Sequence, residues 1–352
     1  MRKAVCCDLA ADGRGDAMRC SDERGRIRKR DFLAALLASG SAIAFVSASA
    51  AQGPRRTVRV GLVGAQGRDA PLYVAFRDRM KALGYQEDKN FIFEFVRTPS
   101  IDAYEESFRE LAARKPDILV AAGNEPALRA ARAAAGGLPI VFLAIDFDPV
   151  AKGFVRSLAR PGGNITGIFV HPLELAAKRI ELAREAFPQA RRLALIWDST
   201  SADQVHAAAA TAQALGFEPH RIELEGHPPD YAAAFAKVTD GPDEPVIIPA
   251  GPIFLRDRAE IERLLLERRI PSIAAFRELA EAGALMSYGA DLVGLFGDVA
   301  VVVDQIVKGA NPADLPIAPS SRFHLAINLK SAAALGITLP LVLTARADEV
   351  FE

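Results

Sequence analysis

Residues Ile140–Gly167 have the sequence IVFLAIDFDPVAKGFVRSLARPGGNITG, which places a buried strand, a polar strand end and a glycine-rich turn in succession. The continuous apolar run Ile140–Ile145 is typical of a parallel strand covered on both faces. The run stops at Asp146–Pro149, and a short helical stretch to Ala159 is expected next. Arg160–Asn164, with two glycines after a proline, then predicts a compliant turn. This order predicts a ligand-facing loop followed by the first crossover between two lobes.

On either side of this stretch, short apolar strands alternate with amphipathic helices. Before the crossover, strands are expected at residues 58–63, 90–96, 117–122 and 138–145. After it, they are expected at residues 193–197, 218–224, 245–249, 272–276 and 284–288. This alternation predicts an α/β fold with mainly parallel sheets, and the length suits two Rossmann-like lobes with separate cores.

Two helices are predicted in more detail. Asp102, followed three residues later by Glu105, is expected to form an N-cap pair. In the helix after the crossover, the buried face is expected to carry Leu173, Ala176, Ile180, Ala183 and Phe187. Glu174 and Lys178 are expected to pair across one turn of that helix's exposed face.

Residues 1–51 differ in character from the rest of the chain. The basic block Arg24–Arg30 precedes the apolar run Phe32–Val46, and Ala48–Ala50 offers a small-residue cleavage site. This order is typical of a secretory signal peptide, and its apolar run of about 15 residues is shorter than the roughly 20 that span a bilayer. We therefore predict export to the periplasm and removal of residues 1–51, with a retained membrane anchor as the alternative.

Two details of export stay open at this level. Lys29–Leu33 is similar to the twin-arginine pattern but has lysine first, so the twin-arginine and general secretory routes are both compatible with it. Met18 is an alternative start to Met1. All the cysteines, Cys6, Cys7 and Cys20, precede residue 52, so the mature chain is expected to have no disulfide and no thiolate site.

The composition argues against a nucleic-acid partner and suggests no reaction. The formal net charge is −1, and no basic face is apparent. Gly61, Gly64 and Gly67 match neither a dinucleotide fingerprint nor a P-loop, and the five histidines show no metal-ligand spacing. Ser199 and Ser201 lack a nucleophile-elbow context. We therefore expect no catalytic residue, metal or cofactor, and the chemistry of a binding protein.

Candidate ligand-binding residues follow from the predicted strands. In open α/β sheets, ligands bind outside the carboxyl ends of parallel strands, near the point where the strand order reverses. The residues at those predicted ends that are expected to bind a ligand are Gln66, Asn124, Asp146, Asp148, Trp197, Asp198, Phe276, Arg277, Tyr288 and Asp291.

Each of the polar candidates has a structural alternative. The amides of Gln66 and Asn124 suit a polar solute, but both residues also form turns and cap helices. Asp146 or Asp148 is a candidate partner for a ligand amine, although Asp148 precedes a proline and suits a loop-fixing role equally well. Arg277 is a candidate clamp for a carboxylate, with a solvated helix arginine as the alternative. Helix N-termini offer another way to bind an anion.

The aromatic candidates leave the ligand undecided. Trp197 is the single tryptophan and ends a predicted strand, so it suits stacking on a flat ligand as well as core packing. The loops at Ala65-Gln66 and Gly123-Asn124 carry no cluster of aromatic residues. From the loops alone, tryptophan itself is therefore not an assured ligand.

Two runs also carry a family resemblance. The pattern DPV…GFV.SLARPGGN.TG within residues 148–167, together with Asn328–Pro340 and Ala345–Val350, is similar to the tryptophan/tyrosine-type substrate-binding proteins of ABC importers. The likeness spans roughly residues 57–352. It implies a type 1 periplasmic binding protein fold, in which two lobes are joined by a multi-strand hinge.

The resemblance also implies a role and a division of the chain. The protein would be a monomeric receptor that closes on a small organic solute, such as an amino acid, and delivers it to an ABC permease in the inner membrane. Lobe 1 would comprise residues 52–166 with 290–320, and lobe 2 residues 167–289 with 321–352. A ligand-sensing subunit for a membrane sensor and, from another class, a periplasmic α/β enzyme remain as alternatives.

Overall fold

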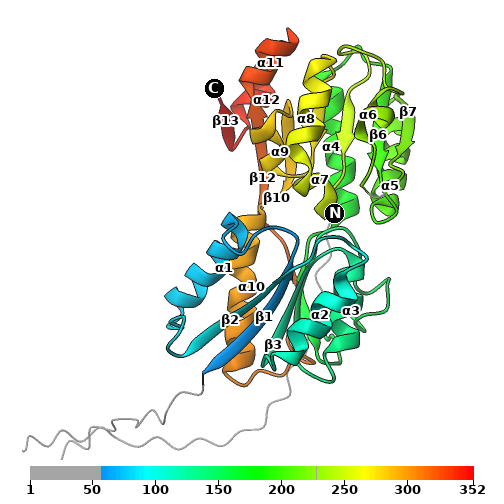
Figure 1. The fold of residues 1–352 in the computed structure, drawn as a ribbon. Helices are drawn as coiled ribbons and strands as arrows, with labels where there is room; N and C mark the ends of the chain where they lie inside the picture. Colours follow the sequence, from blue (N-terminus) through cyan, green and yellow to red (C-terminus); the bar gives the residue numbers. More distant parts are fainter. Residues whose placement is uncertain (1–56, 227) are drawn as a thin grey trace, which may run out of the picture. The chain divides into compact units, whose positions relative to one another are not determined.

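The computed structural model describes residues 57–226 and 228–352. The predicted signal peptide, its export route and the start codon fall on residues outside these ranges. In the described part, strands and helices alternate along the chain (Figure 1). No helix there is both long enough and apolar enough to cross a membrane.

The first sheet has the strand order β11-β5-β4-β3-β1-β2, and all of its paired strands are parallel. Its strands are β1 (Val58–Gly64), β2 (Phe91–Arg97), β3 (Ile118–Gly123), β4 (Ile140–Ala144), β5 (Ile165–Phe169) and β11 (Ala318–Pro319). Because β2 lies on one side of β1 and β3 on the other, the strand order reverses between β1 and β3. The carboxyl ends of these two strands are therefore where a ligand crevice is expected.

Helices cover both faces of this sheet, which explains the apolar run in β4. They are α1 (Pro71–Ala82), α2 (Tyr104–Ala113), α3 (Glu125–Ala134) and α10 (Leu292–Val307). Figure 1 shows α1 and α10 side by side on one face, with α2 and α3 on the other. Val141 and Leu143 pack into the core with α1 and α10, whereas Phe142 packs with α2 and α3. All five β4 residues are buried, so the prediction of a doubly covered strand is confirmed.

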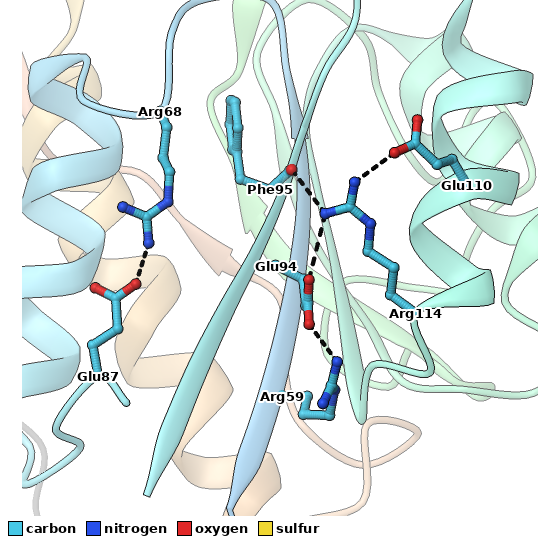
Figure 2. Close-up of polar contacts among 7 residues, drawn as sticks. All are labelled: Arg59, Arg68, Glu87, Glu94, Phe95, Glu110 and Arg114. Carbon is cyan, nitrogen blue, oxygen red and sulfur yellow. Dashed lines mark hydrogen bonds and ion pairs between the residues drawn. The ribbon is translucent and has the colours of Figure 1, made fainter. Parts of the chain in front are cut away.

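The edge strand β2 is held by charged side chains. Figure 2 shows Glu94 of β2 between Arg59 of β1 and Arg114, which follows α2. Arg114 also donates to the Phe95 carbonyl at 3.3 Å and pairs with Glu110. Paired charges of this kind make a sheet edge unattractive to another strand. The cluster connects β1, β2 and the end of α2 and so stabilises the fold. Because Arg59 lies near the amino end of β1, the cluster is apart from the carboxyl strand ends that suit a ligand.

The second sheet has the order β13-β12-β10-β9-β8-β6-β7 and is parallel except for the β10–β12 pair. Its strands are β6 (Arg192–Trp197), β7 (Glu218–Glu223), β8 (Val246–Ile248), β9 (Ser272–Ala274), β10 (Met286–Ala290), β12 (Phe323–Asn328) and β13 (Glu349–Phe351). The remaining helices are α4 (Pro172–Ala186), α5 (Ala202–Ala214), α6 (Tyr231–Phe235), α7 (Pro252–Arg256), α8 (Arg258–Glu267), α9 (Arg277–Ala282), α11 (Leu329–Leu335) and α12 (Leu341–Ala345). The strand order reverses between β6 and β8.

Within the described residues, the chain passes between the sheets at three places. Val170-His171 joins β5 to α4, Asp291 joins β10 to α10, and Ser320–Arg322 joins β11 to β12. Backbone hydrogen bonds tie these segments to the structure, among them Asp291 N–H to the Arg322 carbonyl at 3.1 Å. The predicted α/β class with two mainly parallel sheets is confirmed. The residue limits given for the two lobes stay a prediction.

Three predictions in the first half of the chain are wrong. The turn Arg160–Asn164 is not the first crossover, because it leads into β5 of the first sheet and the chain leaves that sheet only at Val170-His171. The segment before Ala159 forms turns and bends instead of a short helix, and Gly153 within it adopts a left-handed φ of 71°. Asp102 does not cap α2, since the helix begins at Tyr104 and its N-cap residue, Ala103, makes no side-chain cap bond.

Two predictions about α4 are also wrong. Leu173 is 44% exposed, because Leu175 takes the buried position in the first turn of the helix. The other residues expected on the buried face are buried as predicted, namely Ala176, Ile180, Ala183 and Phe187. Glu174 does not pair with Lys178. Lys178 binds Glu181 at 2.6 Å, and Glu174 lies 3.5 Å from His171 at the start of the helix.

Candidate functional site

The carboxyl ends of the two sheets contribute to one small cavity of about 50 Å³. Gln66 after β1 and Gly123 at the end of β3 line it, in agreement with the reversal of strand order between these strands. Pro252 after β8 and Phe276 after β9 line it from the second sheet. A neighbouring hollow of about 420 Å³ is lined by Asp146 and by the start of α4. Strand ends of both sheets therefore meet where a ligand is expected.

Aromatic side chains form much of the cavity wall. They are Tyr73, Tyr104, Phe276 and Phe296, and the rings of Tyr73 and Phe296 meet edge to face at 5.5 Å. Burial raises the pKa of Tyr73 to about 12, although backbone hydrogen bonds with Gln66 and Ala65 oppose the shift. The phenol is therefore neutral at physiological pH. The wall suits the flat apolar part of a ligand.

This wall supplies the aromatic residues that the loops at Ala65-Gln66 and Gly123-Asn124 do not carry. The prediction from sequence considered those loops alone, whereas Tyr73, Tyr104 and Phe296 lie on helices α1, α2 and α10. A usable signal was the position of Tyr73, two residues after the helix-starting Pro71 and close to the predicted strand end. Phe276, which was predicted, lies in the wall.

Asp146 is the most unusual polar group at the site. It is 1% exposed, and within the described structure neither of its carboxylate oxygens has a hydrogen-bond partner. Burial raises its pKa well above the usual range, and repulsion from Asp198 and Glu125 adds to the shift, while Lys152 opposes it. Leaving such a group unpaired in the interior is costly. A ligand cation would remove that cost.

The side chain of Asn124 caps a helix with its oxygen and leaves its nitrogen free to bind a ligand. Its side-chain oxygen accepts a hydrogen bond from the Ala127 N–H at 3.3 Å and so caps α3. Its side-chain nitrogen is buried and has no partner among the described residues. The cap expected as the alternative is thus present, and one donor remains for a ligand. Gln66 lines the cavity and is half-buried.

Three other predicted carboxylates are occupied by their own loops. Asp198 accepts hydrogen bonds from the Ser201 hydroxyl at 2.6 Å and from the Thr200 hydroxyl at 3.0 Å. Asp148 accepts from two backbone N–H groups that follow it, at 2.8 and 3.1 Å. Asp291 accepts from a backbone N–H at 3.0 Å and caps α10. Their geometry favours turn and cap roles, and a ligand contact for any of them stays a prediction.

Arg277 is engaged on both sides of its guanidinium group. It forms a two-pronged pair with Glu349 at 2.5 and 2.6 Å and also donates to Glu281 at 2.8 Å. These acids raise its pKa, Glu349 most strongly.

Trp197 packs against the core of the second sheet, and the ring of Tyr288 lies 6.4 Å from that of Phe323. In the part of the chain that the structure describes, the aromatic cavity is not lined by Arg277, Trp197 or Tyr288.

The solved structures similar to this chain define its class. An ABC domain in complex with L-Trp from Streptococcus pneumoniae has a TM-score of 0.75 and 24% identity, covering 84% of this chain and 100% of that one. A ligand-free, open substrate-binding protein from Clostridium difficile has a TM-score of 0.61 and 21% identity, covering 84% and 99%. At these identities the likeness establishes the fold. The chain is an α/β protein of the two-lobed, type 1 periplasmic binding class.

A family model narrows the class further. The model described as ABC transporter substrate binding protein matches residues 63–351, and the chain belongs to that family. The family is one of solute receptors. A relative from Clostridioides difficile (strain R20291), named tyrosine-binding protein, is 23% identical over 255 residues, which is 72% of each chain. The resemblance inferred from the two sequence motifs is confirmed.

Proposed function

We propose that the protein is an exported receptor of an ABC importer that binds an aromatic amino acid and delivers it to a membrane permease. The observation that carries the proposal is Asp146, a buried carboxyl group with two unpaired oxygens close to an aromatic-walled cavity. A primary ammonium group is the partner that such a carboxylate lacks. The family is consistent with a receptor role.

Each part of an aromatic amino acid has a proposed partner. Asp146 takes the ammonium group, and the unpaired amide nitrogen of Asn124 is a donor for an oxygen of the ligand. Tyr73 and Phe276 hold the ring. The complex of a similar structure with L-Trp and the name of the tyrosine-binding relative support this class of ligand.

Binding is proposed to involve movement of one lobe against the other. The aromatic-walled cavity of about 50 Å³ is far smaller than the roughly 300–1,000 Å³ of typical ligand pockets, so the ligand needs the sheets to separate. The three crossover segments are the places at which such a hinge would bend. The lobes would be residues 52–166 with 290–320, and 167–289 with 321–352.

The cellular role rests on the family and the N-terminal sequence. Residues 1–51 would direct export to the periplasm by either route and then be removed. The mature protein would act as a monomer and present its ligand-bound form to a permease, with no nucleic-acid partner. Membership of the substrate-binding family favours an importer over a sensor subunit.

A thermal-shift screen tests the proposal. The protein is purified free of carried-over ligand and heated with amino acids, aromatic acids, nucleosides and sugars. A ligand at about a hundred times its Kd adds roughly 2.7 kcal/mol, which shifts Tm by several degrees. L-tryptophan or L-tyrosine should give the largest shift, with no product formed. A response to sugars or nucleosides alone, or turnover of a ligand, would refute the proposal.

A further inference from the structure

Arg179 on α4 is a buried cation without a counter-ion. It is 1% exposed, and its guanidinium donates to the Tyr288 carbonyl at 3.1 Å and to the Gln204 side-chain oxygen at 3.4 Å. Its Nε has no partner. Across residues 57–226 and 228–352, no carboxylate lies within salt-bridge distance of Arg179, whereas Arg277 has two such partners. The free protein therefore leaves the charge of Arg179 uncompensated.

Arg179 lies directly behind the wall of the candidate site. It lines a second cavity, of about 10 Å³, together with Ile145 and Phe276. These same two residues line the aromatic-walled cavity, and Ile145 immediately precedes Asp146. One layer of side chains thus separates the guanidinium from the ligand cavity.

A hydrogen-bond network extends from Arg179 to the site. Gln204, which accepts from Arg179, donates to the Ala250 carbonyl at 2.7 Å and accepts from the Ala250 N–H at 3.0 Å. Ala250 lies two residues before Pro252, which lines the ligand cavity. The guanidinium is therefore fixed relative to the loop that meets the ligand.

The physical consequence follows from the low dielectric of the interior. A buried charge interacts more strongly with an opposite charge than it would in water, and the attraction offsets the cost of its own burial. Burial lowers the pKa of Arg179 to about 10, so the group remains protonated at neutral pH. An anion that reaches the wall of the cavity would meet a cation that no protein acid neutralises.

We propose that Arg179 supplies the counter-charge for the carboxylate of the bound amino acid and so determines specificity for an amino acid over an amine. This inference rests on the proposed function and deepens it. Asp146 takes the ammonium group from the first sheet, and Arg179 attracts the carboxylate from α4. A zwitterion thereby brings an opposite charge to each of two buried groups, the Asp146 carboxyl and the Arg179 guanidinium, neither of which has an ion-pair partner among the described residues.

The test compares ligands that differ only in the carboxylate. Kd values for L-tryptophan and tryptamine, and for L-tyrosine and tyramine, are measured by calorimetry on the wild type, Arg179→Gln and Arg179→Lys. Lys178→Gln is the matched control, because it removes one positive charge from the same helix at an ion pair with Glu181 on the surface. Thermal melts of the empty proteins check folding.

The expected result is a loss confined to the amino acids. Arg179→Gln should weaken their binding roughly 30-fold or more, as truncation of one partner in a buried charge pair does. Binding of the amines should stay within about twofold of wild type, since they lack the group that Arg179 attracts. Arg179→Lys should keep the preference for the amino acids, and Lys178→Gln should behave as the wild type.

Several outcomes would overturn the inference. Equal weakening of amino acids and amines by Arg179→Gln would show that Arg179 only positions the Ala250 loop. Unchanged amino-acid binding would show that its charge has no effect. If Arg179→Gln does not fold, loss of the amino-acid preference in folded Arg179→Lys would contradict the inference. Failure of the wild type to bind any of the four ligands would refute the proposed function, and the inference with it.

Discussion

The carboxyl ends of the two sheets carry similar polar residues, but these residues differ in whether their polar atoms have hydrogen-bond partners. At the end of the first sheet, Asp146 and Asn124 are buried and keep polar atoms unpaired. At the end of the second, Asp198 is saturated by its own loop, and Arg277 is held by two glutamates. Position at a strand end is therefore not enough to identify a binding group. Its remaining hydrogen-bonding capacity separates the two regions.

The local sequence explains the difference between the two aspartates. Asp198 is followed by Ser199-Thr200-Ser201, whose hydroxyls at the second and third positions return to its carboxylate. Asp146 is followed by Phe147 and then by Asp148-Pro149. Phe147 has no polar side-chain group, Pro149 has no N–H, and Asp148 itself takes the next two N–H groups. The loop after β4 therefore has little to offer Asp146.

Asp146→Asn should have the largest effect on the proposed site. It removes the charge that attracts the ammonium group, so the Kd for an aromatic amino acid should rise roughly 100-fold, within the range for breaking a buried charge pair. The Tm of the empty protein should not fall, since the Asp146 carboxylate oxygens accept no hydrogen bond that the substitution would remove. Calorimetry and thermal melts measure both. In wild type, binding should weaken as pH falls through the raised pKa of Asp146. An unchanged Kd would show that Asp146 does not bind the ligand, although its carboxylate is unpaired.

Glu262→Gln tests whether an unpaired buried carboxyl alone implies binding. Glu262 of α8 is buried, accepts from the Ser272 hydroxyl at 2.7 Å and has a second oxygen without a partner. Burial raises its pKa from 4.5 to about 8, against the effect of Ser272. The folded state then binds more protons than the unfolded state between these pH values. Wild-type stability should therefore fall as pH rises, by up to about 1.4 kcal/mol per pH unit from this group.

The glutamine variant should lose the part of that slope that Glu262 contributes, while the other acids with raised pKa values, such as Asp146, keep theirs. It should not lose ligand affinity, because Glu262 lines neither the aromatic cavity nor the hollow beside it in the described structure. Urea unfolding at pH 5 to 8, with Kd measured in parallel, provides the check. A slope in Glu262→Gln as steep as that of the wild type would contradict the assignment of a raised pKa to Glu262. Weaker binding would contradict the distinction between a buried acid and a site acid.

Asp198→Ala should lower the stability of the protein and leave its ligand affinity nearly unchanged, which is the reverse of the result expected for Asp146→Asn. It removes the carboxylate that accepts from the Thr200 and Ser201 hydroxyls and the Ser201 N–H, although both Ser201 donors keep the Asp198 backbone carbonyl as an acceptor. The free energy of unfolding should therefore fall by about 1 kcal/mol. The Kd should change far less than in Asp146→Asn, because the lost bonds lie within the loop. Chemical unfolding and calorimetry on the same preparation separate the two quantities. A large rise in Kd at unchanged stability would assign Asp198 to the ligand after all.

Arg277→Gln should have the smallest effect. The side chains of Arg277 and Glu349 are 37% and 31% exposed, so solvent screens their pair, and such pairs contribute up to about 1 kcal/mol. Ligand affinity should stay at the wild-type value, as measured by titration with the ligand found in the screen. Loss of affinity for amino acids but not for amines would instead make Arg277 the carboxylate clamp.

The sequence was most informative about the fold where burial leaves a pattern. The run in β4 could be predicted because both faces of that strand are covered, and the strand ends then followed from the βα alternation. Leu173 shows the limit. An apolar residue near a helix start was expected inside, and its exposure depends on how α4 packs.

The site was predictable in position but not in chemistry. Asp146 and Asn124 were found because they follow strands. Which of their atoms stay free depends on loop geometry that their neighbours determine in three dimensions. Most of the aromatic wall lies on helices α1, α2 and α10 and not on the loops that follow the strands. Arg179 lies in a helix rich in charges, where surface exposure is the usual expectation for arginine.

A crystal structure of the protein grown with L-tryptophan or L-tyrosine is the most direct test of the account. The ammonium nitrogen of the ligand should lie within about 3.2 Å of a carboxylate oxygen of Asp146. The aromatic ring of the ligand should pack against Tyr73 and Phe276. A bound ligand whose amine is held by other groups, with Asp146 still unpaired, would contradict the central claim.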